Sequence, residues 1–282
     1  MRFASFTHGG APGAGIVEGD VVQPFTGIAA LVEYIALDPV VRREVRLGDP
    51  RPLTEVVLTA PVRPRRNVFC VGRNYRDHAA EIARAQGSDD LRLPDVPTFF
   101  TKAPSAIVGP DAEVHFSAAL SHEYDWEAEL AVVIGTRCRD VPADRAREVV
   151  FGYTCLNDLT ARDLQRAHRQ WFKGKSLDDS CPIGPWVVDA AEAGDAQRLG
   201  ISLRLNGVVK QRSNTEQMIF PIDRIIAELS AGLTLEPGDV IATGTPDGVG
   251  MARTPPEFLS DGDVAEVEIE RIGLLRNTIV IR

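Results

Sequence analysis

Two glutamates, Glu127 and Glu129, stand in DWEAELAVVIG, at the start of an apolar, β-branched run that has the character of a buried strand. Side chains alternate between the faces of a strand, so both glutamates leave the same face. Two like charges at this spacing repel each other unless water or a cation lies between them. Because oxygen ligands suit hard cations, the pair indicates a site for Mg²⁺, Mn²⁺ or Ca²⁺. The alternative is an edge strand whose two glutamates are solvated.

A third acid, Asp158 in CLNDLTARDLQ, stands where a strand-like run gives way to a predicted helix. On that helix Arg162 at i+4 and Gln165 at i+7 would share one stripe with Asp158. An acid, a guanidinium and an amide on one face could bind a metal and then a carboxylate or enolate. An N-capping Asp158 in a solvated pair with Arg162 is the alternative explanation.

A lysine, Lys175 in WFKGKSLDDSC, is one of only four lysines in a chain that otherwise uses arginine as its cation. Its neighbour Gly174 would let the backbone approach a ligand closely, and a lysine in a dry pocket can stabilise an enolate or oxyanion. A lysine on a surface loop is the alternative. Another stretch, GTPDGVG, follows a predicted strand and is rich in backbone donors, although turn chemistry alone would explain its glycines. It matches neither a Walker A loop nor the dinucleotide fingerprint.

A histidine and a glutamate, His78 and Glu81 in NYRDHAAE, are spaced i, i+3 and can meet on one face of a helix. A carboxylate orients an imidazole and raises its basicity, so the pair could serve as a general base that activates water. The alternative is an exposed helix with an ordinary charge partner. The polar, Pro-punctuated segment 86–97 that follows could form a lid.

The elements that must position these side chains are many short strands and a few helices, without regular βαβ alternation. This pattern predicts an α+β protein built on antiparallel or mixed sheets. Helical spacing is predicted near residues 27–37, 74–87 and 220–235, and Asn206-Gly207 predicts the turn of a hairpin. The Pro- and Arg-rich connector TAPVRPRRN predicts a boundary between a small N-terminal α+β domain, 1–62, and a catalytic domain, 63–282.

Composition excludes several classes of protein. The chain has 282 residues and a net charge of −9, which argues against a nucleic-acid or anionic-membrane partner. No apolar run is long enough for a transmembrane helix, and no secretory signal is visible, so we expect a cytoplasmic protein. The four scattered cysteines indicate reduced core thiols. The motifs G-x-S-x-G and H-E-x-x-H and a zinc-type Cys/His set do not occur, which argues against a serine hydrolase or a zinc enzyme.

Six longer stretches, taken together and in order, point to one family. They are VGRNYRDHAAE, FFTKAPSAIVGP, DWEAELAVVIG, GYTCLNDLTARDLQ, FKGKSLDDSCPIGPW and LEPGDVIATGTPDGVG. From about residue 65 to the end, the chain resembles the fumarylacetoacetate hydrolase family. The resemblance implies layered mixed β-sheets in a sandwich-like roll with few helices, a homodimer, and a bound Mg²⁺ or Mn²⁺.

The resemblance also implies roles for individual residues. The implied metal ligands are Glu127, Glu129 and Asp158. The implied contacts to the keto-acid oxygens of the substrate come from Arg162, Gln165, Gly244 and Thr245. The implied catalytic residues are His78 and Glu81, which match the water-activating dyad of the smaller acylpyruvate-cleaving members, and Lys175, which would stabilise negative charge.

The implied activity is hydrolysis of a C–C bond in an acylpyruvate- or fumarylpyruvate-type 2,4-dioxo acid through an enolate that the metal stabilises. The same enolate can be reprotonated or can lose CO₂, so a 2-hydroxymuconate-type isomerase and an oxaloacetate decarboxylase are alternatives. A binding protein with a vestigial site is a third. The N-terminal segment is much shorter than the extra domain of the vertebrate tyrosine-pathway hydrolase, which weighs against fumarylacetoacetate itself as the substrate.

Overall fold

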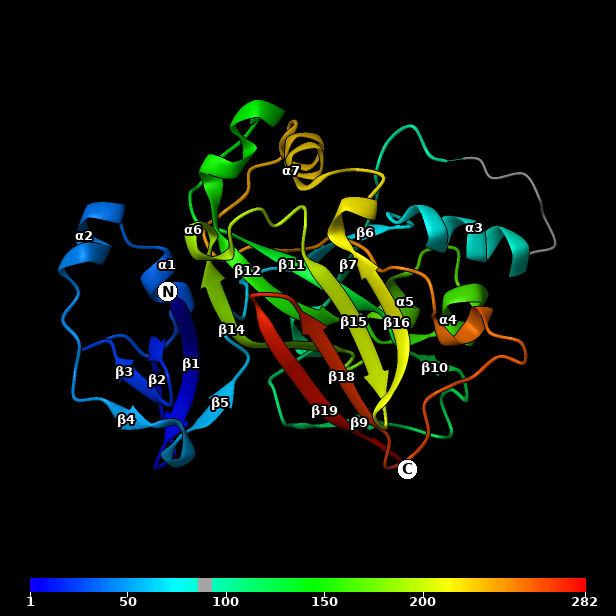
Figure 1. Cartoon of the computed structure of the whole chain (residues 1–282), viewed down its shortest axis with the longest axis horizontal. Helices are drawn as coiled ribbons and strands as arrows, with labels where there is room; N and C mark the ends of the chain where they lie inside the picture. The colour runs from blue at the N-terminus through cyan, green and yellow to red at the C-terminus, as the bar shows by residue number, and fades with distance from the viewer. Residues whose placement is uncertain (86–92) are drawn as a thin grey trace.

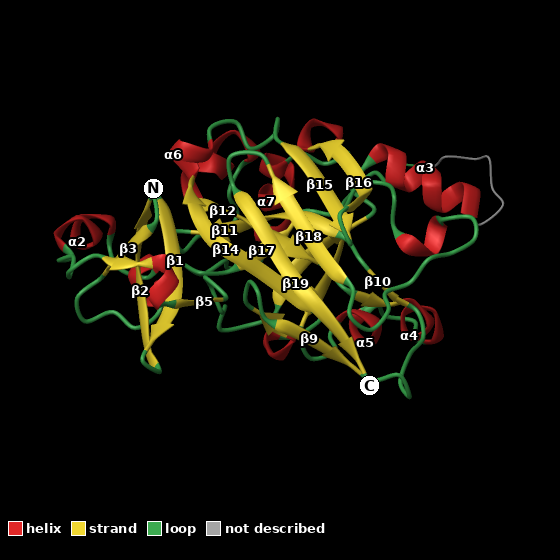
Figure 2. Cartoon of the chain, turned by 60° about the horizontal axis from the view of Figure 1, so that its bottom comes forward, coloured by secondary structure: helices red, strands yellow, loops and turns green. Residues whose placement is uncertain are grey.

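The computed structural model describes residues 1–85 and 93–282 and confirms the α+β class (Figure 1). Strands in three β-sheets make up most of the regular secondary structure, and the helices are short and lie at the margins of the sheets (Figure 2). The helices are α1 (Leu31–Ile35), α2 (Pro39–Glu44), α3 (Arg76–Ala85), α4 (Arg162–Ala167), α5 (Phe172–Lys175), α6 (Ala190–Ala193) and α7 (Ile222–Ser230). Short 3₁₀ helices are η1 (Leu53–Glu55), η2 (Pro104–Ala106), η3 (Ala143–Val149), η4 (Thr215–Gln217) and η5 (Gly250–Ala252).

The largest sheet has 12 strands and contains the central strands of the molecule. Its main path runs β4-β3-β2-β1-β14-β12-β11-β17-β6-β7, while β5 pairs with β1 and β8 pairs with β14. The bounds are β1 (Arg2–His8), β2 (Ala11–Glu18), β3 (Val21–Pro24), β4 (Arg51–Pro52), β5 (Val57–Thr59), β6 (Val68–Gly72), β7 (Thr98–Lys102), β8 (Ile107–Val108), β11 (Ala128–Ile134), β12 (Val150–Asn157), β14 (Cys181–Asp189) and β17 (Val240–Ala242).

A second sheet of five strands packs against the face of β11 and β12 (Figures 1 and 2). Its order is β16-β15-β18-β19-β9, and a separate two-stranded sheet pairs β10 with β13. The bounds are β9 (Glu113–Phe116), β15 (Gly200–Leu205), β16 (Val208–Asn214), β18 (Val264–Ile269), β19 (Gly273–Ile281), β10 (Tyr124–Asp125) and β13 (Thr160–Ala161). The predicted hairpin is confirmed, since Asn206 and Gly207 join β15 to β16 with φ of 52° and 77°.

Strand β11 lies in the interior because both of its faces are covered. Leu130 and Val132 point into the core shared with the five-stranded sheet, whereas Ala131 and Val133 point into a second core on the opposite face. Both cores are apolar, which explains why this strand reads as a continuous hydrophobic run rather than an alternating one. The glutamates at its beginning therefore enter the middle of the molecule.

The N-terminal strands extend the large sheet. Strand β1 pairs antiparallel with β14, where Phe3 lies opposite Val187. Phe3 and Tyr34 contribute to the second core together with Val133, so the first 60 residues share apolar contacts with the central strands. A boundary at residue 62 stays a prediction. None of the helices in residues 1–85 and 93–282 has the length and apolar character needed to cross a bilayer.

Candidate active site

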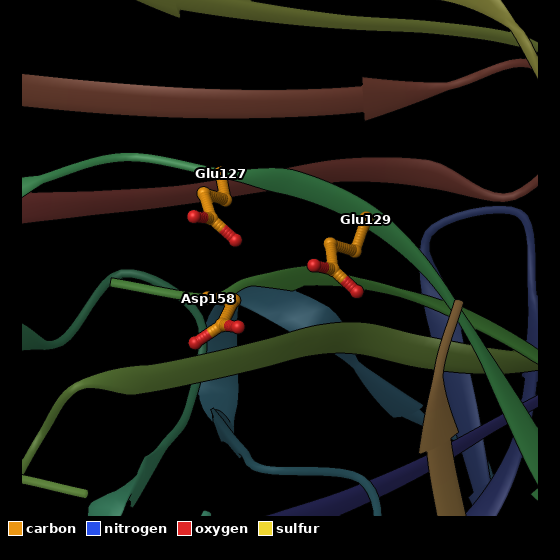
Figure 3. A group of neighbouring side chains, drawn as sticks. All are labelled: Glu127, Glu129 and Asp158. Atoms are coloured by element: carbon orange, nitrogen blue, oxygen red, sulfur yellow. The ribbon is translucent and has the colours of Figure 1, made fainter. Parts of the chain in front are cut away.

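Three carboxylates converge where strand β11 begins and strand β12 ends (Figure 3). One oxygen from each of Glu127, Glu129 and Asp158 lies within 4.8 Å of the others. The pairing of the two strands explains this, because Ala128 lies opposite Asn157 in the antiparallel register. The next residue, Asp158, donates its backbone N–H to the carbonyl of Glu127 at 2.9 Å. Residues about 30 positions apart in the chain thus form one site.

All three side chains are buried. The exposed fractions are 6% for Glu127, 1% for Glu129 and 0% for Asp158. The alternative of a solvated edge strand is therefore wrong, because β11 lies between β12 and β17 and both glutamates are buried. Burying a carboxylate costs free energy unless charges or hydrogen bonds compensate it, so the surroundings of the triad decide what the site can do.

The helical stripe predicted for Asp158, Arg162 and Gln165 is wrong in part. Helix α4 begins at Arg162 and its N-cap is Ala161, so Asp158 lies before it, in the turn between β12 and β13. The Arg162–Gln165 part of the stripe exists, and the Arg162 Nη1 group donates to Gln165 Oε1 at 3.1 Å. The N-capping alternative for Asp158 is wrong for the same reason.

Lys175 is buried against the triad rather than placed on a surface loop. It is 2% exposed, and its Nζ donates to Glu127 Oε2 at 2.8 Å and to Asp158 Oδ2 at 2.7 Å. The preceding Gly174 makes this possible, since a Cβ there would lie 2.6 Å from the backbone nitrogen of Gln165. Helices α4 and α5 can approach each other only because this position carries no side chain.

A second buried lysine, Lys102, was missed in the sequence. It lies at the end of β7, is 0% exposed, and donates from Nζ to Asp158 Oδ1 at 2.6 Å and to the carbonyl of Leu159 at 3.1 Å. Its third hydrogen bond reaches the carbonyl of Lys175. All three donors of the ammonium are used, so Lys102 fixes Asp158 and Lys175 relative to each other. The sequence feature that could have drawn attention to Lys102 is the rarity of lysine in this chain.

Asp125, the first residue of DWEAEL, was also missed. It is 0% exposed and accepts from Arg162 Nε at 2.8 Å and from the backbone N–H of Gly250 at 2.7 Å. Arg162 Nη2 lies 2.8 Å from Glu127 Oε1, so one guanidinium connects Asp125 to the triad. Asp125 thereby neutralises and orients Arg162, and it ties η5 to the site.

The charges of the triad suit a divalent cation. Lys175 and Arg162 outweigh the effect of burial on Glu127 and hold its pKa below the usual range. Burial, followed by repulsion from Asp158 and Glu127, raises the pKa of Glu129 well above its usual range. Within the described residues no lysine or arginine pairs with Glu129. Three buried oxygen donors, one without a cationic partner, fit a hard ion such as Mg²⁺ or Mn²⁺.

The GTPDGVG turn contacts the triad through its backbone. Gly244 donates its N–H to Glu129 Oε2 at 2.7 Å. Its φ is +98°, and a Cβ there would lie 2.7 Å from the Cβ of Asn74, so only glycine fits this position. The next residue, Thr245, is 3% exposed and its hydroxyl accepts from Gln211 Nε2 at 2.8 Å. The glycine is therefore more than turn chemistry, because its conformation brings an N–H to a buried carboxylate.

His78 and Glu81 meet on α3 as their spacing predicted. His78 Nδ1 lies 3.2 Å from Glu81 Oε2, and His78 is 6% exposed, so the alternative of a fully exposed helix face is wrong for the histidine. The other oxygen of Glu81 accepts from the backbone N–H of Gly248 at 2.9 Å. Glu81 thus holds the imidazole and also ties α3 to the GTPDGVG turn.

A cavity of about 210 Å³ joins these groups. Its lining includes Glu127, Glu129, Lys175, His78 and Thr245. Pockets for drug-sized ligands hold roughly 300–1,000 Å³, so this cavity suits a small acid. The lid hypothesis for 86–97 concerns a segment of which residues 86–92 lie outside the described part of the chain.

Two protein-family models match this chain, one over most of its length and one at its N-terminus. Residues 67–280 match the model described as "Fumarylacetoacetate (FAA) hydrolase C-terminal", and residues 1–61 match one described as "Rv2993c-like, N-terminal". The first match covers well over half of the chain. The protein belongs to the fumarylacetoacetate hydrolase family, and the resemblance drawn from its motifs is confirmed.

Individual relatives carry different activities in their names. The chain is 45% identical over 228 residues to the oxaloacetate tautomerase YisK of Bacillus subtilis, covering 80% of this chain and 74% of that protein. The solved structure of a fumarylacetoacetate hydrolase from Exiguobacterium antarcticum superposes with a TM-score of 0.84 at 40% identity, covering 100% of both chains. A 5-carboxymethyl-2-hydroxymuconate delta-isomerase from Mycobacterium smegmatis superposes with a TM-score of 0.83 at 34% identity, again over 100% of both.

Proposed function

We propose that the protein is a divalent-metal-dependent isomerase that moves a proton between carbon and oxygen of an enolisable 2-oxo acid. The observation that carries this proposal is the buried triad of Glu127, Glu129 and Asp158, whose two glutamates line a small cavity together with His78. We call the triad with Lys102 and Lys175 the floor of this cavity. A tautomerase and a muconate-type isomerase among the relatives support isomerisation more than the hydrolysis expected from the motifs.

The triad residues would hold Mg²⁺ or Mn²⁺, with Ca²⁺ as a further candidate. When bound, the ion supplies Lewis-acid stabilisation of the negative charge on an enolate oxygen. Arg162 and Gln165 line the same cavity and would supply a positive charge and an amide donor near the carboxylate of the substrate, while Asp125 and Glu127 hold the guanidinium in place. Lys175 keeps a positive charge at the floor, because its ammonium is already paired with Glu127 and Asp158.

His78 would carry the proton. Glu81 accepts from the Nδ1 side of the ring, so Nε2 would take a proton from the carbon next to the keto group and deliver it to the enolate oxygen. The bond that breaks is C–H and the bond that forms is O–H, or the reverse, so no water enters the reaction.

Hydrolysis of an acylpyruvate is the second candidate, and the His78–Glu81 pair is what favours it. The same imidazole could remove a proton from water instead of carbon and direct the hydroxide to the distal carbonyl. The products differ, since hydrolysis yields pyruvate and a carboxylic acid, decarboxylation yields CO₂, and isomerisation conserves the mass.

The test is the rate at which enol-oxaloacetate becomes the keto form, followed by loss of enol absorbance and by capture of the keto form with excess malate dehydrogenase. Protein given Mg²⁺ or Mn²⁺ should accelerate the conversion above the rate of the metal alone, and EDTA should abolish the acceleration. The Glu129→Gln variant serves as the blank for metal-catalysed enolisation. Turnover of acetylpyruvate to pyruvate and acetate without any effect on oxaloacetate would establish the hydrolase instead. The homodimer and the cytoplasmic location stay predictions.

A further inference from the structure

Two arginines of the cavity lining, Arg73 and Arg166, have no part in the chemistry above. Arg73 directly follows β6 and lines the same cavity as Glu127 and His78. Unlike the cations at the floor, it is exposed to solvent. An exposed residue in the lining lies where the cavity meets solvent, whereas the triad is buried.

The backbone of Arg73 is held rigidly. Its φ is +55°, a left-handed conformation that costs a non-glycine residue free energy and persists only where neighbours enforce it. The next residue, Asn74, is 0% exposed, donates to the carbonyl of Thr243 at 2.7 Å and accepts from the N–H of Phe220 at 2.8 Å. These contacts fix the chain between β6 and α3, so the position of the arginine does not depend on its own side chain.

The guanidinium is placed by an aromatic ring. Trp171 packs directly on Gly72, where an added Cβ would lie 2.3 Å from the indole, so only glycine allows this contact. The centre of the Arg73 guanidinium lies 5.9 Å from the centroid of the same ring. A guanidinium beside an indole face gains a cation–π contribution and keeps its edge free for a ligand.

Arg73 is also the cavity cation whose charge is not already compensated. Arg162 pairs with Asp125, Lys175 pairs with Glu127, and Arg166 pairs with Glu123 at 2.5 Å. In the described part of the chain Arg73 forms no ion pair. A guanidinium binds a carboxylate through two parallel hydrogen bonds, which requires that no other acid occupies its edge.

We infer that Arg73 binds the second carboxylate of the substrate and so selects 2-oxo acids that carry a carboxylate at each end. The inference rests on the proposed function, since it places the 2-oxo end of the same substrate against the triad. Arg73 acts as a specificity-determining residue that leaves the reacting atoms to His78 and the floor of the cavity.

The experiment measures binding of two unreactive probes to the Mg²⁺-loaded protein by calorimetry. N-oxalylglycine carries both carboxylates, whereas N-ethyloxamate has the same oxamate end without the distal carboxylate. The variants are Arg73→Gln, Arg73→Lys and, as a matched control, Arg76→Gln, which changes a neighbouring exposed arginine outside the cavity lining. A charged hydrogen-bonded pair contributes enough that Arg73→Gln should weaken N-oxalylglycine binding about 10- to 100-fold. Arg73→Lys should recover part of that loss.

N-ethyloxamate should bind wild type and Arg73→Gln with affinities within about twofold, and Arg76→Gln should change neither probe, because its side chain lies outside the cavity. Equal affinity of wild type for both probes, or an equal loss of both in Arg73→Gln, would overturn the inference. The same comparison by kcat/KM uses oxaloacetate and acetylpyruvate, which differ at the distal group. If no 2-oxo acid is turned over but N-oxalylglycine binding depends on Arg73, the proposed reaction fails and the carboxylate subsite stands.

Discussion

The floor of the cavity and its outer wall are built differently. At the floor, Glu127, Glu129 and Asp158 lie with two lysines where β11 begins and β12 ends, and each of these residues is at most 6% exposed. The outer wall is the segment from Arg73 through α3, which reaches the surface. The charges at the floor are buried and paired with one another, with Arg162 and with backbone groups, so a change to one disturbs the rest. The wall can change at lower cost, and we infer that it determines which acid and which reaction the floor serves.

The largest effect should come from Glu129→Gln. This change removes the negative charge from one of the three oxygen donors of the triad, puts a weaker neutral amide oxygen in its place, and leaves the hydrogen bonds of Lys175 intact. Lewis-acid stabilisation is worth several kcal/mol, so we expect kcat/KM for oxaloacetate to fall on the order of 10³-fold. The exposed Glu113→Gln is the control and should retain full activity.

The same variant should lose activity but not thermal stability. Because the pKa of Glu129 is raised in the folded chain, keeping it ionised at neutral pH costs stability, and protonation relieves that cost at low pH. The metal-free Glu129→Gln protein should therefore have a Tm at pH 7 equal to or above that of wild type. A clear loss of Tm would mean that the carboxylate is a structural anion.

The next largest effect should be on folding, in Lys102→Met. This change leaves Asp158 buried without one of its two ammonium partners and orphans the carbonyls of Leu159 and Lys175. Breaking a buried pair from one side costs about 3–5 kcal/mol, which urea unfolding of the metal-free protein would measure. The exposed Lys173→Met should cost under about 0.5 kcal/mol. Similar losses in both variants would contradict the distinction between floor and surface.

A change in the wall should lower catalysis without weakening metal binding. His78→Ala removes the proposed proton carrier and none of the triad donors, so catalysis should fall about 10²-fold or more while Mg²⁺ affinity survives. The readouts are the keto–enol rate with oxaloacetate and the pyruvate yield from acetylpyruvate. Loss of metal binding together with activity would show that His78 belongs to the floor.

The smallest effect should be that of Glu81→Gln, which keeps the size of the side chain and removes its charge. Partners that orient a functional imidazole typically contribute about 10- to 100-fold, and the retained amide oxygen places this variant near the lower value. The expected signature is a fall in kcat with KM unchanged. A rise in KM alone would indicate that Glu81 acts by anchoring the Gly248 turn.

The sequence pattern correctly predicted those features that depend on residues close together in the chain. The i, i+3 spacing of His78 and Glu81 predicted their contact on a helix, and the apolar run after Glu129 predicted a buried strand. The order of long motifs was sufficient for the family, and with it for the layered sheets.

Contacts between residues far apart in the chain could not be predicted from the sequence pattern. Lys102 lies 56 positions before Asp158, and nothing in the spacing shows that β7 ends beside the β12–β13 turn. The sequence pattern predicts that the helix of Arg162 and Gln165 also includes Asp158. The two-residue strand β13 lies between Asp158 and that helix, so the carboxylate of Asp158 lies with the triad instead. Asp125 was overlooked because its partners, Arg162 and the η5 backbone, meet it only through tertiary contacts.

The most direct test of the floor-and-wall account is a Mn²⁺ titration followed by electron paramagnetic resonance. It should compare wild type, Glu129→Gln and His78→Ala under the same conditions. The account predicts one bound Mn²⁺ per chain in wild type and in His78→Ala, and no saturable site in Glu129→Gln. Undiminished binding in Glu129→Gln, or loss of binding in His78→Ala, would contradict it.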